Sequence, residues 1–362
     1  MGARGSYSGC AVSERREELR LGFLSFGHWQ RAQWSRTLTA KDALAQTVEL
    51  AQAAEEIGID GAFVRVHHFA RQLGSPFPLL AAMGARTSRI ELGTAVIDMR
   101  YENPLYMAED AAAADLIAGG RLQLGISRGS PEPVLDGPEA FGYPDAQGEA
   151  GGELARAHTE LFRRAIAGEG VARADPAYTG MSGLLPIQPY AEGLSERIWW
   201  GAGGRESARW VAQQGMNMMS STLLLEDTGV PFDELQAEQI DAYHEAWRAA
   251  GWERTPRVSV SRSVIPITSD LDRRYFGRDE NADQVGYLDG HTSRFGRTYT
   301  GEPDAIAAEL AQDRAVRAAD TVLLTVPNQL GVDYNAHLLE TIAREIAPAL
   351  GWAPKDESRV RA

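Results

Sequence analysis

The chain has 362 residues, of which 44% are hydrophobic and 24% are charged. This length suits one large α/β barrel with insertions or two ordinary domains, and the charged fraction is typical of a soluble globular protein. The formal net charge of −14 argues against a nucleic-acid partner, because proteins that bind nucleic acids normally carry a basic stripe.

Cysteine content and hydropathy indicate the compartment. The single cysteine, Cys10, excludes an intramolecular disulfide and fits the reducing cytoplasm. No apolar run reaches about 18 residues, so we expect no membrane span. The first 18 residues lack the apolar core of a secretory signal. We expect a disordered leader over residues 1–18, one domain over 19–351 and a tail over 352–362.

Eight apolar runs along the chain predict strands, and a helical segment follows each of them. Most runs are continuously apolar, as expected for parallel strands covered on both faces. The expected strands are Leu19–Ser25, Gly61–His67, Ile90–Ile97, Leu122–Ser127, Arg197–Gly201, Met216–Ser220, Arg257–Ile267 and Thr321–Val326. The expected helices are Ala43–Ile57, Pro76–Ala85, Pro104–Ile117, Leu154–Ala167, Glu206–Gln214, Phe232–Ala250, Pro303–Ala311 and Ala336–Leu350.

Strict alternation of this kind predicts a parallel sheet, and eight units favour closure into a (β/α)8 TIM barrel. The alternative is a doubly wound open sheet, which would need a glycine-rich turn after the first strand; residues 26–29 read Phe-Gly-His-Trp instead. Three long segments interrupt the barrel pattern: 131–152, 171–196 and 269–300. The aromatic residues of 269–300 favour a packed lid over a solvated excursion.

Chemistry-bearing residues follow several strands at the rim where barrel enzymes place their active sites. His67 and His68 end the second strand, and a histidine there can transfer protons or simply hydrogen-bond within the loop. No ligand-spaced set of metal-binding residues accompanies the pair. Arg128 after the fourth strand can bind a phosphate, or pair with Glu132 or Asp136. The segment 203–207 (Gly-Gly-Arg-Glu-Ser) can cradle a phosphate at a helix N-terminus, or be a plain cap.

Together these stretches resemble the luciferase-like flavin monooxygenases. The matching strings are AFVRVHHF over 62–69, IELGTAVIDM over 90–99, GGRLQLGISRG over 119–129 and GGRESARWVAQQG over 203–215, with Asn103-Pro104-Leu105 and Ala108-Glu109-Asp110 between them. The likeness runs in order from about residue 19 to residue 351. It implies a luciferase-like TIM barrel with insertions at the C-terminal rim, where FMN binds.

The resemblance also implies two-component chemistry. A separate flavin reductase would supply reduced FMN, oxygen would add to give a flavin C4a-peroxide, and that species would oxygenate a small organic substrate. Such a reaction requires a site that excludes water. The family commonly pairs its barrels, so a homodimer is expected. Apolar faces at Leu79-Leu80 and over 111–114 would permit that pairing.

Site residues follow from the same resemblance. His67 matches the catalytic histidine, and Ala95 and Val96 match a pair joined by a non-proline cis peptide near the flavin ring. Ser127 stands where a reactive cysteine occurs in luciferase. The residues implied to hold the cofactor phosphate are Arg128, Arg156, Gly203, Gly204, Arg205, Glu206 and Ser207.

Two departures from the family pattern bear on the activity. Val66 replaces an acid that often precedes the histidine pair, and Ser127 excludes thiol chemistry, so light emission and aldehyde specificity are not implied. The same fold also serves enzymes that use the deazaflavin F420 for hydride transfer. Two further hypotheses are a non-catalytic flavin-binding protein and a barrel enzyme acting on phosphorylated metabolites.

Overall fold

The structure is a computed structural model that describes residues 19–129, 132–144, 148–224, 229–277, 284–288 and 291–354. For residues 284–288 and 291–295 only the backbone is described. The expected leader over 1–18 and the part of the expected tail from residue 355 onward lie outside the described residues.

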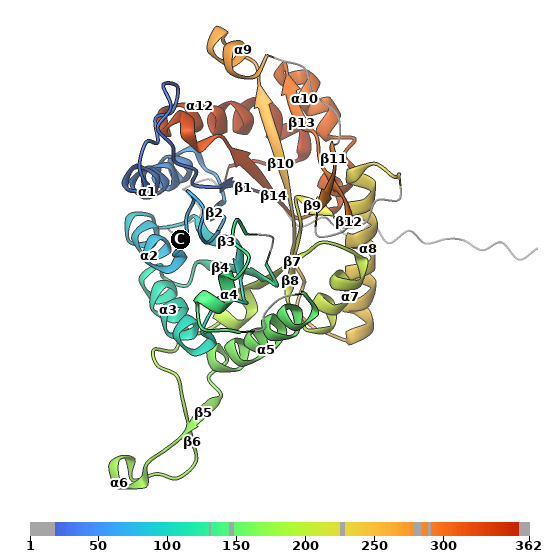
Figure 1. Cartoon of the computed structure of the whole chain (residues 1–362). Helices are drawn as coiled ribbons and strands as arrows, with labels where there is room; N and C mark the ends of the chain where they lie inside the picture. The colour runs from blue at the N-terminus through green and yellow to red at the C-terminus, as the bar shows by residue number, and fades with distance from the viewer. Residues whose placement is uncertain are drawn as a thin grey trace, which may run out of the picture.

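Within the described ranges, eight parallel strands close into a barrel (Figure 1). Strand β10 pairs with both β8 and β14, which joins the two ends of the sheet. In pairing order the strands are β1 (Arg20–Ser25), β2 (Gly61–Val64), β3 (Glu91–Asp98), β4 (Leu122–Ser127), β7 (Ile198–Ala202), β8 (Asn217–Ser220), β10 (Val258–Pro266) and β14 (Thr321–Val326). The predicted barrel is confirmed, and the open sheet is wrong because this ring has no free edge.

Helices surround the barrel (Figure 1), and local sequence signals set their ends. In α1, Thr39 and Asp42 form a reciprocal capping box, and Gly58 ends the helix at a φ of 100°. The larger helices are α1 (Ala40–Ile57), α2 (Pro76–Arg86), α3 (Pro104–Ile117), α5 (Gly148–Ile166), α7 (Arg205–Gln213), α8 (Phe232–Ala250), α10 (Pro303–Leu310) and α12 (Val332–Thr341). Helical turns over 342–350 continue the last of these. No helix in the described ranges is long and apolar enough to cross a membrane.

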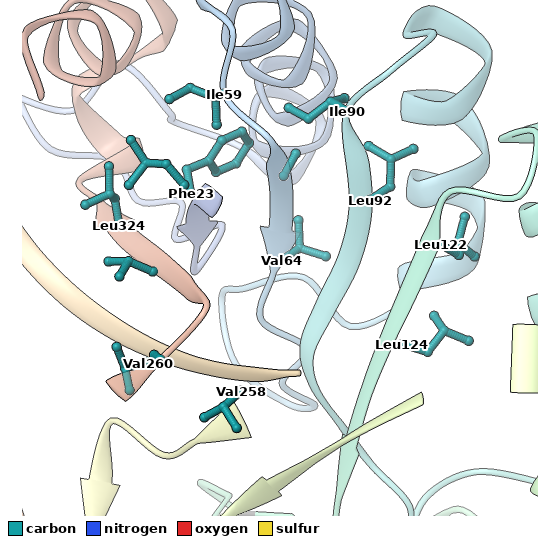
Figure 2. Close-up of a cluster of buried hydrophobic side chains, with 14 of the residues drawn as sticks. Phe23, Ile59, Val64, Ile90, Leu92, Leu122, Leu124, Val258, Val260 and Leu324 are labelled. Atoms are coloured by element: carbon teal, nitrogen blue, oxygen red, sulfur yellow. The ribbon is translucent and has the colours of Figure 1, made fainter. Parts of the chain in front are cut away.

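Alternating strand residues build two apolar layers. Those that face the helices form the main core, in which Phe23, Leu92 and Leu124 are buried (Figure 2). Those that face the barrel interior include Phe63 and Trp199, which pack together in a second cluster with Leu24, Met219 and Leu323. The barrel centre is therefore filled with side chains, which leaves only its two ends for polar groups.

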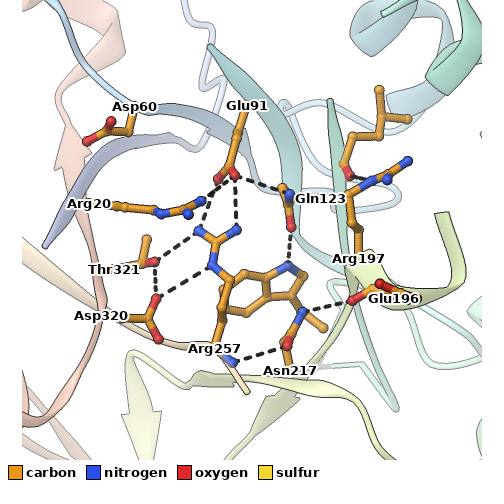
Figure 3. A network of polar contacts seen from close by, with 12 residues as sticks. Arg20, Asp60, Glu91, Gln123, Glu196, Arg197, Asn217, Arg257, Asp320 and Thr321 are labelled. Atoms are coloured by element: carbon orange, nitrogen blue, oxygen red, sulfur yellow. Dashed lines mark hydrogen bonds and ion pairs between the residues drawn. The ribbon is translucent and has the colours of Figure 1, made fainter. Parts of the chain in front are cut away.

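A polar network closes the end of the barrel at which the strands begin (Figure 3). The Glu91 carboxylate accepts hydrogen bonds from Arg20 at 2.7 Å, from both terminal nitrogens of Arg257 at 3.0 Å, and from Gln123 at 3.3 Å. Gln123 in turn accepts the Trp199 indole N–H at 2.8 Å, and the Arg257 guanidinium lies 4.8 Å from that ring. This end is occupied by groups that compensate one another's charges, which leaves the opposite end for a ligand.

The interruptions of the barrel pattern contain structure of their own. The segment before β7 holds the hairpin β5 (Gly170–Arg173) and β6 (Leu184–Pro186) with the short α6 (Pro176–Thr179), and it extends away from the barrel (Figure 1). After β10 come α9 (Asp270–Phe276), the antiparallel pair β11 (Gln284–Leu288) and β12 (His291–Phe295), and β13 (Thr298–Gly301), which lies beside β10. Strand β12 also pairs with β9 (Leu223–Leu224). Two short α-helices, α4 (Gly137–Ala140) and α11 (Arg314–Ala318), and two 3-10 helices, η1 (Leu194–Arg197) and η2 (Asn328–Leu330), are also present.

Two expectations from the sequence need correction. Strand β2 ends at Val64 rather than at His67, because the chain leaves the sheet and the His67 N–H bonds the Leu73 carbonyl at 2.9 Å instead. The apolar residues at Leu79-Leu80 and at 111, 112 and 114 cannot supply a pairing face, since they are buried against the barrel. The large apolar side chains that α3 exposes are Tyr106, Leu116 and Ile117. The homodimer itself stays a prediction.

We expect Glu91→Gln to destabilise the fold, because it removes the charge that compensates Arg257. These side chains are only 19% and 14% exposed, and breaking a buried pair costs about 3–5 kcal/mol. Asp320 remains 3.6 Å from Arg257, so we expect a loss of about 2–3 kcal/mol in urea-induced unfolding. Glu169→Gln is the control, since its pair with Arg164 is exposed and its loss should leave the midpoint unchanged. Equal midpoints for both variants would contradict the expectation.

Candidate active site

Small side chains form a flat floor at the open end of the barrel. The Ala95–Val96 peptide bond is cis, as the resemblance implied, and the pairing register between β3 and β4 shifts at these two residues. A Cβ built on Gly201 would lie 3.2 Å from Val96 Cγ1 and 3.4 Å from Ser127 Cβ. Val96, Ser127 and Gly201 therefore meet at this end, where the missing Cβ of Gly201 makes room for the side chains of its two neighbours. Ala95 and Val96 pack against the interior cluster.

Helix α7 follows β7 directly, so its first turn lies at this rim of the barrel. Gly204 is its N-cap, and the Ser207 hydroxyl donates to the Gly204 carbonyl at 2.8 Å and accepts from its N–H at 3.3 Å. The Arg205 guanidinium is turned away to Glu238 on α8, at 2.9 Å. The first-turn N–H groups and the positive end of the helix dipole are the features of this turn that suit an anion.

The two predicted arginines lie beside α5, and one of them contacts α7. Arg128 is exposed, and its Nη1 lies 3.9 Å from the position of a Cβ on Gly152 of α5. Gly152 and Arg156 are four residues apart, so they share one face of that helix. Arg156 lies over the Trp210 ring of α7, 5.3 Å from its centre, one turn beyond Ser207. Arg128 thus approaches the face of α5 that carries Arg156, and Arg156 also contacts α7.

Trp200 and Trp199 on β7 point to opposite sides of the barrel wall. Trp200 points outward and meets Trp210 edge to face at 4.8 Å, whereas its neighbour Trp199 points inward. The indole of Trp210 is therefore fixed between Trp200 and Arg156, which orients that arginine.

The two histidines after β2 separate because the strand has already ended. His68 is buried in an aromatic cluster, with its ring 4.4 Å from Tyr101 and 5.1 Å from Phe141. Burial lowers the pKa of His68, which favours its neutral form. His67 instead places Nδ1 2.6 Å from a carboxylate oxygen of Glu132. His68 therefore packs among aromatic rings, whereas His67 contacts a carboxylate.

Glu132 was not recognised as a site residue from the sequence, which offered it only as a partner of Arg128. It lies four residues after Arg128, and its second oxygen accepts the His68 backbone N–H at 3.2 Å. The signal that could have found it is the missing acid at Val66. An acid from the connection after β4 stands beside the histidine instead.

Further charged groups surround His67. Arg65 lies over the Phe26 ring at 5.0 Å, and Phe26 stacks on His28 at 5.8 Å with an interplanar angle of 6°. Burial lowers the pKa of His28, and Arg65 and His67 lower it further. Burial also raises the pKa of Asp98, while its bonds to Arg100 oppose that change. The rim around His67 is therefore aromatic and mixed in charge.

A cavity of about 340 Å³ lies elsewhere, outside the barrel between β10, β13 and the ends of α8 and α10. Its buried polar groups bond one another: Arg262 pairs with Asp313 through two hydrogen bonds, and Tyr299 donates to the same carboxylate at 2.6 Å. None of the predicted site residues lines it. Among the described residues, no three His, Cys, Asp or Glu side chains gather in a way that could hold a metal ion.

Comparison with known proteins identifies the family. The family model described as luciferase-like monooxygenase matches residues 23–319. The chain belongs to that family. The family match covers β1 through α11, so it includes the floor, the helix turn and His67.

Curated relatives resemble parts of the chain. It is 31% identical to an alkanal monooxygenase alpha chain of a Kryptophanaron alfredi symbiont over 29% of its length, which is 30% of that relative. It is 32% identical to the oxygenase component of a flavin-dependent trigonelline monooxygenase of Acinetobacter baylyi, over 30% of each chain. It is 27% identical to limonene 1,2-monooxygenase of Rhodococcus erythropolis over 47% of this chain and 43% of that one. The matches span between 24% and 49% of the length of the curated relatives.

Solved structures share the fold over almost the whole chain. A monooxygenase from Streptomyces bottropensis superposes with a TM-score of 0.68 at 20% identity, over 91% of this chain and 99% of that one. The oxygenating constituent of 3,6-diketocamphane monooxygenase from Pseudomonas putida, in complex with FMN, gives 0.64 at 16% identity over 92% and 99%. The F420-dependent tetrahydromethanopterin reductase of Methanopyrus kandleri gives 0.61 at 16% identity over 92% and 100%. At these identities the likeness establishes the barrel fold alone.

We expect the stability of the protein to depend on Glu102, which follows β3 at the same rim. Burial raises its pKa from 4.5 to about 7, and Asp98 and Asp110 add to the effect. Folded protein therefore holds a proton that the unfolded chain loses between those pH values, so stability falls as pH rises through this window. Glu102→Gln removes the linkage, and wild type should lose about 2–3 kcal/mol relative to the variant between pH 4.5 and pH 7. If the free energy of unfolding changed equally with pH in wild type and variant, the expectation would be contradicted.

Proposed function

We propose that this protein is an FMN-dependent monooxygenase that takes reduced FMN from a separate flavin reductase and uses oxygen to oxygenate a small organic substrate. The observation that carries the proposal is that Arg156 contacts α7 one turn beyond Ser207, on the side of α5 that Arg128 approaches. A phosphate would fit these two arginines and the α7 N-terminus, a flat ring would lie on the small side chains near Val96, and His67 follows β2 at the same rim. Membership of the luciferase-like monooxygenase family supports this chemistry.

Arg128, Arg156 and the α7 N-terminus would hold the cofactor phosphate. Guanidinium groups bind phosphate through paired, charge-assisted hydrogen bonds, and the helix adds backbone N–H donors. The Ser207 hydroxyl already caps the helix, so its main contribution is to keep that turn in place. Glu206 and Arg205 contribute through their backbone, because the Arg205 side chain is engaged with Glu238.

The floor over Ala95, Val96, Ser127 and Gly201 would position the ring. Reduced FMN supplies the electrons that activate oxygen when it is bound. The interior cluster beneath the floor excludes water from below, since Phe63, Trp199 and Met219 are buried there. His67 would hold or transfer a proton at Nε2, because its other ring nitrogen faces Glu132.

F420-dependent hydride transfer is the second candidate, because enzymes with that cofactor share this fold. We expect FMN to bind more tightly than F420 in fluorescence titrations of the apoprotein. Tighter binding of F420 would favour hydride transfer over oxygenation.

We expect Arg128→Leu to weaken FMN binding by about tenfold or more, since a hydrogen bond to a charged group is worth about 1.5–3 kcal/mol. Riboflavin, which lacks the phosphate, is the control ligand, and its affinity should be the same for wild type and variant. Arg164→Leu is the control variant, because this arginine pairs with Glu169 near the opposite end of α5. An equal loss of affinity for both ligands would contradict a phosphate contact.

We expect the protein to slow the oxidation of reduced FMN by oxygen, measured by the return of oxidised-flavin absorbance. His67→Ala should speed that return about tenfold or more, because the group that accepts a proton at Nε2 beside the ring is lost. Far-ultraviolet circular dichroism of the variant checks that it folds. Oxidation of the flavin in the presence of wild-type protein at the rate found in buffer would count against the proposed function.

A further inference from the structure

We infer that Glu132 is a positioning residue that sets the tautomer and orientation of His67; the inference rests on the proposed function for the role of His67 itself. The Glu132 carboxylate comes from the connection after β4, whereas His67 comes from the connection after β2. The two side chains are joined only by tertiary structure, with 2.6 Å between Nδ1 and Oε2.

Both side chains of the His67–Glu132 contact are buried, which strengthens their interaction. The His67 and Glu132 side chains are 11% and 5% exposed, so water competes little for either group. A carboxylate in so dry a place needs donors on its oxygens. One oxygen faces His67 Nδ1, and the other accepts the His68 backbone N–H. Both partners of the carboxylate therefore belong to the same histidine pair.

The closeness of the carboxylate favours one position of the proton on the ring. A neutral imidazole carries one N–H, and the negative oxygen 2.6 Å from Nδ1 favours that proton on Nδ1, although the two atoms are not aligned as a hydrogen bond. The lone pair is then left at Nε2, where it can accept a proton from a reacting group. Free imidazole side chains favour the opposite tautomer, so without Glu132 the proton would move to Nε2 and the base would be lost.

Charged and aromatic groups pack around the His67–Glu132 pair. Arg65 and His28 lie on the β1 and β2 side, Asp98 and Arg100 on the β3 side, and His68 packs between Tyr101 and Phe141. Asp98 is engaged by Arg100 through three hydrogen bonds from its side chain. Among these groups it is Glu132 that contacts His67 Nδ1.

The test uses the full apoprotein labelled with ¹⁵N-histidine, in which His67→Ala assigns the His67 signals among the seven histidines. We expect wild type to show the Nδ1–H tautomer at His67 with a slowly exchanging Nδ1 proton. Glu132→Ala should change the tautomer to Nε2–H, and Glu132→Gln, whose amide oxygen still accepts, should keep Nδ1–H. The exposed Glu139 on α4 is the control, and Glu139→Ala should leave the His67 signals unchanged.

A second readout is the oxidation of reduced FMN. Glu132→Ala should speed it about tenfold, and the double variant with His67→Ala should be no faster than His67→Ala alone, because the two residues act as one unit. Unchanged His67 signals in Glu132→Ala, or additive effects of the two substitutions, would overturn the inference. Failure of the proposed function would appear separately, as wild-type protein that does not slow flavin oxidation while the tautomer still depends on Glu132.

Discussion

Closure of the parallel barrel is the constraint on which the rest of the structure depends. Because all eight barrel strands of the described chain run the same way, their carboxyl ends meet at one rim, and residues far apart in sequence become neighbours. The two ends of the barrel then take different roles. The Glu91–Arg257 network fills one end with mutually satisfied charges, and the opposite end carries small side chains, a helix N-terminus and His67.

The candidate site combines parts that are fixed in different ways. The proposed phosphate site would use the first turn of α7 together with Arg128 and Arg156, of which Arg156 is oriented by the Trp210 ring. The small side chains near Gly201 pack closely above the barrel interior. His67 contacts a carboxylate from another connection.

Local signals predicted much of this arrangement. Two barrel strands, β4 and β14, have the predicted bounds, as do α3 and α8, because apolar runs and capping residues mark their ends directly. The β5–β6 hairpin was read only as an insertion, since its strands are short and partly exposed and show no buried run. Strand β2 was read too long because Val66 continues the apolar pattern after the ladder has ended. The lid expected over 269–300 stays a prediction, and residues 278–283 and 289–290 within it lie outside the described ranges.

The sequence by itself determined the alternation that makes a barrel, the rim that carries the site, and the strings that resemble the family. These follow from periodicity and motif, which are local properties of the chain. Only the tertiary structure decided that Trp200 faces outward, that Arg205 turns to Glu238, that His67 and not His68 stands at the rim, and that Glu132 is its partner. Each of these depends on contacts between segments that are distant in the chain, and barrel closure sets those contacts.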